Sequence, residues 1–174
     1  MSRSASRAAA LGLLVAGQLT IAPLITPSAG ADLTLAAGAT SESTAAVKAE
    51  LDRRLPLERL HERLSLRLAG GLLLLASEEE DGNAALTLAP ALRWTFAAGR
   101  EPFLEGGIGA ALFLKTRVET RNLSTAFQFE DRLAVGMPWA GGELSLALTH
   151  YSNAGIKRPN DGVETLMLGY RFPL

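Results

Sequence analysis

Residues 32–174 predict an all-β fold, an eight-stranded antiparallel up-and-down transmembrane β-barrel. Three observations lead to this expectation. Apolar and polar residues alternate with a period of two, which is the period of a strand with two different faces. Most of the alternating segments reach the length of about nine to eleven residues that a tilted transmembrane strand needs. The polar face is rich in small residues, which fit the narrow interior of an eight-stranded barrel.

Eight segments of this kind follow one another along the chain. We expect strands at roughly 32–40, 44–55, 62–76, 84–98, 102–117, 124–137, 141–154 and 163–174. Closing them into a barrel leaves no unpaired strand edge, which the hydrocarbon of a bilayer would not tolerate. No segment after residue 31 has eighteen uninterrupted apolar residues, so we expect no transmembrane helix.

The two faces are clearest in the third and fourth segments. Large residues form one face: Leu64, Leu66, Leu68, Leu72 and Leu74, and then Leu86, Leu88, Leu92, Trp94 and Phe96. Small or polar residues form the other: Ser65, Arg67, Ala69 and Gly71, and then Thr87, Ala89, Ala91, Arg93 and Thr95. We expect the large apolar side chains to meet lipid and the small polar ones to fill the barrel.

The sixth, seventh and eighth segments repeat this alternation. Their predicted lipid faces carry Phe127, Phe129, Leu133 and Val135, then Leu144, Leu146 and Leu148, and then Leu166, Leu168, Tyr170, Phe172 and Leu174. Two features fit less well. Aromatic residues make up only 6% of the chain, which leaves the interfacial girdles thin. Asp131 falls on the lipid face of the sixth segment, and a bulge, a shift of register or a role in a site would each explain it.

A soluble β-sandwich, with the apolar face as its core, is the alternative. The segments are long for a sandwich. The polar face also lacks the mixed character of a solvated surface, because its charges are isolated among Gly, Ala, Ser and Thr: Arg67, Arg93, Glu105, Glu130, Arg132 and Arg171. Both observations favour the membrane barrel.

The connections agree with this topology. If both termini are periplasmic, the turns at 98–101 and 138–142 lie on the periplasmic side, and the loops at 77–83, 117–123 and 155–162 lie outside. The acidic run Glu78–Asp81 is expected to be a solvated loop, with recruitment of divalent cations from the outer leaflet as the alternative.

Residues 1–31 have the form of a cleaved secretory signal peptide. Arg3 and Arg7 give a basic start, residues 8–16 are apolar but too short to span a bilayer, and small residues precede Asp32. A short membrane anchor is the alternative, against which two prolines within the apolar region argue. We therefore expect one mature domain, residues 32–174.

Composition excludes several classes of site. The chain has no cysteine, which rules out disulfides, thiolate metal sites and a cysteine nucleophile. Its two histidines, His61 and His150, argue against a histidine-rich metal site. Loss of the signal would take the net charge from −1 to −3, which gives no indication of nucleic-acid binding. We expect neither a metal nor another cofactor.

Residues 150–164, HYSNAGIKRPNDGVE, combine the groups needed for ester hydrolysis. His150 and Ser152 share the lipid face of the seventh segment, and Glu164 shares that of the eighth. A spacing of two places His150 beside Ser152, and antiparallel pairing can bring Glu164 across. We predict Ser152 as nucleophile, His150 as general base and acid, and Glu164 as the group that orients the imidazole.

A tetrahedral intermediate also needs donors for its oxyanion. Asn160 is the first candidate, Asn153 the weaker one because its parity points inward, and Gly162 could supply a backbone N–H. Ordinary roles remain as alternatives. The histidine, serine and glutamate could bind headgroups or water at the rim, and PNDG could be only a turn.

The second half of the chain resembles the lipid A 3-O-deacylases of Gram-negative outer membranes, the PagL family. The resemblance rests on HYSNAG, on PNDG followed two residues later by glutamate, on PFLEGGIGAALF (102–113) and on NLSTAFQFEDRLAVG (122–136). It covers most of residues 100–174, whereas residues 32–99 match only in barrel character. It implies an outer-membrane barrel that hydrolyses the ester at position 3 of lipid A and releases a hydroxy fatty acid. It also implies the same roles for Ser152, His150 and Glu164, and an oxyanion role for Asn160.

The expected partners follow from this reading. They are lipid A or lipopolysaccharide as substrate at the outer leaflet, outer-membrane lipids, and the barrel-assembly machinery, with no nucleic acid and with a homodimer left open. Lys157 and Arg158 could contact phosphate. The chain ends in Leu174 where that machinery usually meets an aromatic residue, and Phe172 on the same face is expected to serve instead. Rival functions are a structural or adhesin barrel and another lipid enzyme, a phospholipase or an acyltransferase.

Overall fold

The computed structural model of the protein describes residues 30–77 and 82–174. Its long strands are β1 (Asp32–Thr40), β2 (Ala45–Pro56), β3 (Leu64–Leu75), β4 (Asn83–Thr95), β5 (Phe103–Phe113), β8 (Phe127–Trp139), β9 (Gly142–Ser152) and β10 (Val163–Phe172). Two very short strands, β6 (Arg117–Val118) and β7 (Arg121–Asn122), pair with each other. The predicted signal peptide, apart from its last two residues, and the acidic run Glu78–Asp81 lie outside the described residues.

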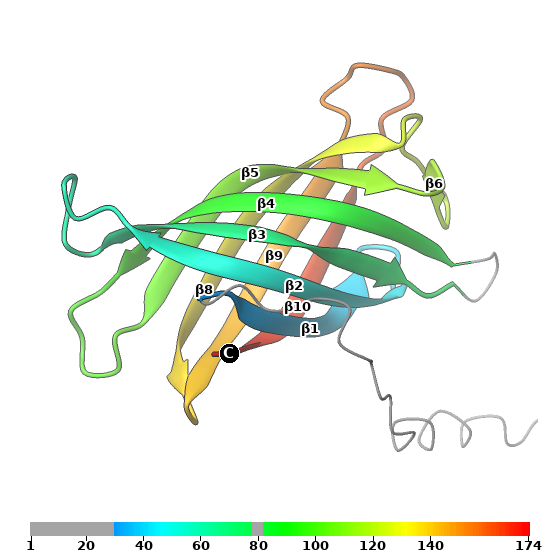
Figure 1. The fold of residues 1–174 in the computed structure, drawn as a ribbon. Coiled ribbons are helices and arrows are strands. Elements are labelled where there is room, and N and C mark those ends of the chain that lie inside the picture. The colour runs from blue at the N-terminus through cyan, green and yellow to red at the C-terminus, as the bar shows by residue number, and fades with distance from the viewer. Residues whose placement is uncertain (1–29, 78–81) are drawn as a thin grey trace, which may run out of the picture.

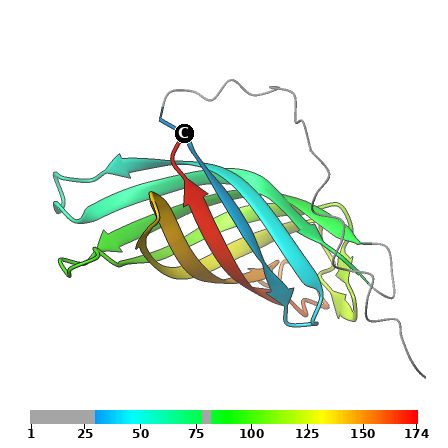
Figure 2. The same ribbon diagram turned by 90° about the horizontal axis from the view of Figure 1, so that it is seen from below.

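The eight long strands close into one barrel in the order β1-β10-β9-β8-β5-β4-β3-β2. All neighbours are antiparallel, and the first and last strands pair over Leu33 to Thr40 to complete the ring. Figures 1 and 2 show long, strongly tilted strands around one axis. The prediction of an eight-stranded up-and-down barrel is confirmed. In the part of the chain that the structure describes, no helix is long and apolar enough to cross a membrane.

Seven of the eight strands begin and end within three residues of the expected positions. The fifth does not, because β5 ends at Phe113 and not near residue 117. Beyond Phe113 the chain leaves the sheet and forms the β6–β7 hairpin over the end of the barrel. The extension predicted for this strand is therefore wrong, since Val118 belongs to the hairpin and is buried in the apolar cluster at the end of the barrel, not in a barrel strand.

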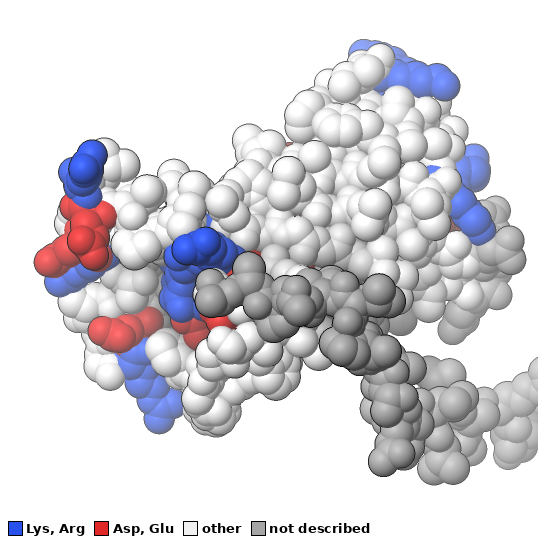
Figure 3. Space-filling model, viewed as in Figure 1, with Lys and Arg blue, Asp and Glu red and all other residues white. Residues whose placement is uncertain are grey.

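The outer surface is apolar where the alternation predicts it. The large hydrophobic side chains more than a third exposed include Leu68, Leu72, Leu74, Leu86, Leu88, Leu92, Leu133, Val135, Leu146, Leu148, Leu166 and Leu168. Figure 3 shows charged side chains gathered towards the ends of the face it presents, with an uncharged area between them. This surface suits contact with lipid.

Paired charges fill much of the interior. Examples of these ion pairs are Lys48 with Glu130 (2.6 Å), Arg93 with Glu143 (2.7 Å), Arg171 with Asp52 (2.8 Å) and Arg67 with Glu50 (2.9 Å). Charged groups out of water are tolerated when they are paired and hydrogen-bonded, and removing one partner is costly. The charged side chains that we expected in the interior therefore lie there. Two acids of β2, Glu50 and Asp52, pair with Arg67 and Arg171.

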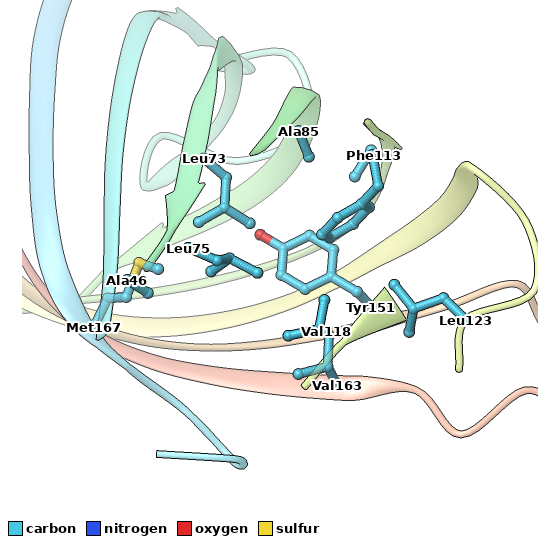
Figure 4. Close-up of a cluster of buried hydrophobic side chains, with 11 residues drawn as sticks. Ala46, Leu73, Leu75, Ala85, Phe113, Val118, Leu123, Tyr151, Val163 and Met167 are labelled. Atoms are coloured by element: carbon cyan, nitrogen blue, oxygen red, sulfur yellow. The ribbon is translucent and has the colours of Figure 1, made fainter. Parts of the chain in front are cut away.

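The interior becomes apolar at the end where β5 meets the β6–β7 hairpin. Tyr151, Phe113 and Leu73 pack there with Leu123 and Val118 from the hairpin segment, all buried (Figure 4). The rings of Phe113 and Tyr151 meet edge to face, with centroids 5.4 Å apart. This apolar plug fills the end of the barrel that carries residues 150–164 and supports the loops above it.

Candidate active site

His150 and Glu164 meet on the outer surface of the barrel. They are register partners on β9 and β10, which lie side by side. His150 Nδ1 lies 2.9 Å from Glu164 Oε1, and the two side chains are 40% and 43% exposed. The expectation that antiparallel pairing brings Glu164 to His150 is met in the structure. A carboxylate that accepts a hydrogen bond from Nδ1–H fixes the tautomer of the imidazole, and Nε2 is then the nitrogen that can accept a proton.

Ser152 lies two residues beyond His150 on β9 and shares its outward face. Its register partner across the sheet is Phe129 of β8. Ser152 is partly exposed, but no hydrogen bond joins its hydroxyl to His150 within the described residues. The structure therefore places the three predicted site residues on one surface and joins two of them directly.

Asp131 occupies the third position of the same row. It is the register partner of His150 on β8, so Asp131, His150 and Glu164 lie on adjacent strands at one level. Pairing of β8 with both neighbours is continuous through this residue. A bulge or a register shift therefore does not explain its outward position, and a role in the site stays a prediction.

Asn153 organises the loop that follows β9. Its side chain is fully buried, as its inward parity predicted. Its Nδ2 group donates to the carbonyls of Leu123 and Lys157, both at 2.8 Å, and its Oδ1 accepts from Gly155 N–H at 2.9 Å. The amide is thus occupied within the protein, which favours Asn160 over Asn153 as a donor to a bound ligand.

Asn160 closes the same loop from its other end. Its Oδ1 accepts the backbone N–H of Asn153 at 3.0 Å. The side chain stays partly exposed, and this contact fixes the amide through its oxygen. Among the described residues, no hydrogen bond involves its Nδ2 group.

Gly162 packs against the imidazole ring of His150. A Cβ atom at this position would come 2.8 Å from His150 Cε1 and 3.4 Å from Nε2. The residue is buried and its φ is +63°, in the left-handed region that favours glycine. Both the backbone conformation and the close approach therefore require glycine here.

The β6–β7 hairpin ties this loop to the barrel. Asn122 N–H donates to Asp161 Oδ2 at 2.7 Å, and Asp161 N–H donates back to the Asn122 carbonyl at 3.3 Å. Arg121 donates to the Asp161 carbonyl at 3.3 Å. These contacts hold residues 160–162 in place from outside the loop.

The turn between β1 and β2 completes the assembly. Glu42 accepts hydrogen bonds from Thr120 and, at 2.7 Å, from Arg121. These donors stabilise the ionised form and lower the pKa of Glu42 below its usual range. Ser41 N–H donates to the Glu164 carbonyl at 2.9 Å. The turn thus contacts both the hairpin and the strand that carries Glu164.

Sequence reasoning missed the roles of Glu42, Thr120 and Arg121. Strands of two residues carry no measurable alternation, and contacts between separate loops have no local signal. The only sequence indication is the polar, charged composition of residues 115–122, which excludes a membrane-spanning continuation of β5.

Comparison with known proteins adds the following findings. Residues 46–173 match the family described as lipid A 3-O-deacylase (PagL). A relative from Pseudomonas aeruginosa, named lipid A deacylase PagL, is 42% identical over 99 residues, which are 56% of this chain and 57% of the relative. A protein of the same name from Bordetella bronchiseptica is 36% identical over 84 residues, 48% of this chain and 46% of the relative. The chain thus matches about half the length of each.

A solved structure described as the outer membrane enzyme PagL superimposes with a TM-score of 0.75. Its sequence is 34% identical, and the match covers 82% of this chain and 99% of that one. The similarity thus extends over most of this chain and nearly all of the solved one.

Proposed function

The chain belongs to the lipid A 3-O-deacylase (PagL) family, and on that premise we propose that it is an outer-membrane esterase that hydrolyses the 3-O-linked hydroxyacyl chain of lipid A. The observation that carries the proposal is the 2.9 Å contact between His150 Nδ1 and Glu164 Oε1 on the lipid-facing surface. A base oriented by a carboxylate and open to lipid suits a substrate that is itself a membrane lipid.

In this reaction Ser152 Oγ attacks the ester carbonyl while His150 Nε2 takes its proton. Glu164 keeps Nδ1 protonated and stabilises the imidazolium that forms. The tetrahedral intermediate collapses, the sugar hydroxyl leaves with the proton from His150, and the acyl group stays on Ser152. Water, deprotonated by His150, then attacks the acyl-enzyme; His150 returns this proton to Ser152 Oγ as the hydroxy fatty acid leaves, which restores the enzyme.

The oxyanion needs donors aimed at the carbonyl oxygen. We assign this role to Asn160 Nδ2 with the N–H of Gly162. Support comes from the contact that holds Asn160 by its oxygen and from the packing of Gly162 against His150. Asn153 supports the site by shaping the loop rather than by binding the oxyanion.

The surroundings suit a lipid that arrives from the side. Leu148 and Leu166 are register partners, and each lies two residues from His150 or Glu164 on the same outward face. Both side chains are about half exposed. We assign them to the acyl chains of the substrate. We also assign Lys157 and Arg158, which are exposed in the loop above, to contacts with phosphate groups on the sugar.

Mass spectrometry of lipid A from cells that express the chain tests the proposal. The wild-type protein should remove one hydroxyacyl chain, and Ser152→Ala should remove none while still forming a heat-modifiable barrel. Ser145→Ala, at the opposite end of the same strand, is the matched control and should be fully active. Deacylation by the Ser152→Ala variant would refute the assignment.

The same spectra separate the rival functions. A structural or adhesin barrel would leave lipid A unchanged, an acyltransferase would add a chain, and a phospholipase would cut phospholipids instead. Assembly by the barrel-assembly machinery through Phe172 is part of the proposal. Phe172 is 41% exposed at the end of β10 and packs edge to face against Tyr170, with ring centroids 4.7 Å apart.

A further inference from the structure

A second feature of the outer surface lies far from His150. It is an apolar depression of about 680 Å³ on the lipid-facing side of β5, β8 and β9. Outward side chains that line it include Leu104, Val135, Met137 and Leu146, and it is also lined by Ala98 and Pro102 of the turn between β4 and β5. It therefore lies towards the end of the barrel that carries both termini.

The depression lies deeper along the bilayer normal than the proposed deacylase site. Its nearest residue on β9, Leu146, is six residues from Ser152, which is about 20 Å along a strand. For a strand tilt of about 40° this corresponds to about 15 Å along the bilayer normal, half of a hydrocarbon core of about 30 Å. The depression thus faces the periplasmic leaflet.

A smaller depression, of about 460 Å³, adjoins it at the rim and shares Ala98. Arg100 and Glu101 line it, and the Arg100 guanidinium lies 5.5 Å from the centroid of the Trp139 ring. Neither residue forms an ion pair within residues 30–77 and 82–174, unlike the paired charges inside the barrel. One positive and one negative side chain therefore stand unpaired beside an apolar depression.

We propose that these two depressions bind one glycerophospholipid of the periplasmic leaflet that has a zwitterionic, ammonium-bearing headgroup. An acyl chain occupies the larger depression, the phosphate binds Arg100 and the ammonium binds Glu101. A cation and an anion beside an apolar depression match the phosphate, the ammonium and an acyl chain of one such lipid, and this complementarity selects the lipid. This site is separate from the proposed deacylase site and serves a different ligand.

Native mass spectrometry of the purified full chain tests the site. The protein is titrated in detergent with palmitoyl-oleoyl phosphatidylethanolamine or with the matching phosphatidylglycerol. The wild-type protein should retain one phosphatidylethanolamine in preference to phosphatidylglycerol. Val135→Trp fills the larger depression and should abolish retention. Val47→Trp is the matched control, because Val47 and Val135 are equally exposed (50% and 51%) but Val47 lies on β2, away from the depression.

Arg100→Gln gives an independent test that does not depend on a bulky substitution in a strand. It should weaken retention about tenfold, the expected loss for one charge-assisted contact of about 1.4 kcal/mol. Arg53→Gln, also exposed near this rim but outside both depressions, should bind as the wild type does. Equal retention by the Val135→Trp and Val47→Trp variants, or equal retention of both lipids, would overturn the proposal. A dimer without bound lipid would also overturn it.

Discussion

His150 and Glu164 are joined at 2.9 Å across two neighbouring strands, from positions that are directly paired in the sheet. Backbone hydrogen bonds of the barrel therefore fix the separation of their Cα atoms, and only the side-chain torsions remain to be set. A site built on paired strands keeps its geometry better than one built on a loop.

Replacing Glu164 by Gln should lower deacylation by roughly 10²- to 10⁴-fold, because an amide no longer stabilises the imidazolium or fixes the tautomer of His150. Release of hydroxy fatty acid from purified lipopolysaccharide in detergent measures the effect. Glu58→Gln, an exposed acid in the turn between β2 and β3, is the control and should retain full activity. Wild-type rates from Glu164→Gln would show that the contact has no part in catalysis.

Gly162→Ala should reduce kcat severely while the barrel still folds. The added methyl group would push against His150, 2.8 Å from Cε1, and the positive φ would be strained as well. Gly155→Ala separates the two effects, since Gly155 also has a positive φ (+81°) in the same loop but has open space around its Cβ position. Equal losses in both variants would trace the defect to backbone strain and not to displacement of the imidazole.

Asp161→Ala should loosen the loop without unfolding the barrel, because it removes the acceptor that holds the Asn122 N–H at 2.7 Å. We expect faster hydrogen exchange in residues 153–162 and a several-fold lower kcat, of the size expected for about 1 kcal/mol. Asp161→Asn keeps an oxygen acceptor and should restore most of the activity. If exchange in the loop is unchanged in Asp161→Ala, the hairpin does not hold it.

The contact of Glu42 with Thr120 and Arg121 should make the hairpin sensitive to acid. The pKa of Glu42 is lowered in the folded protein, so the contact contributes stability at neutral pH. That contribution is lost as the pH falls from the ordinary glutamate value of about 4.3 through the lowered pKa. Hydrogen exchange of residues 117–122 should therefore accelerate in this range. In the Glu42→Gln variant, hydrogen exchange of these residues should already be faster at neutral pH and should not accelerate further in this pH range. An acceleration of the same size in the variant would show that another acid is responsible.

The period-two pattern was sufficient to predict the barrel and its two faces. Residues such as Leu86 and Thr87 differ in polarity strongly enough to assign a side to a whole strand. Register was harder, because alternation says which face a residue occupies but not which residue lies opposite. The pairing of Lys48 with Glu130, 82 positions apart, has no trace in the sequence of either strand.

The candidate site also has one part that could be predicted from the sequence and one part that could not. The outward facing of His150, Ser152 and Glu164 is a local property, so the sequence predicted it. The shape of the loop after Ser152 depends on a bond from Asn153 to the Leu123 carbonyl, 30 residues earlier, and on the β6–β7 hairpin. Because those contacts are made only when the barrel closes, no local pattern could reveal them.

The ion pairs inside the barrel and the polar row outside it occupy alternate positions of the same strands. On β9, for example, Glu143 serves the interior and His150 the surface. A substitution on the outward face can therefore change what the surface binds while the ion pairs that hold the barrel together stay in place. Neighbouring residues of one strand thus carry two separate tasks, stability on the inner face and ligand recognition on the outer face.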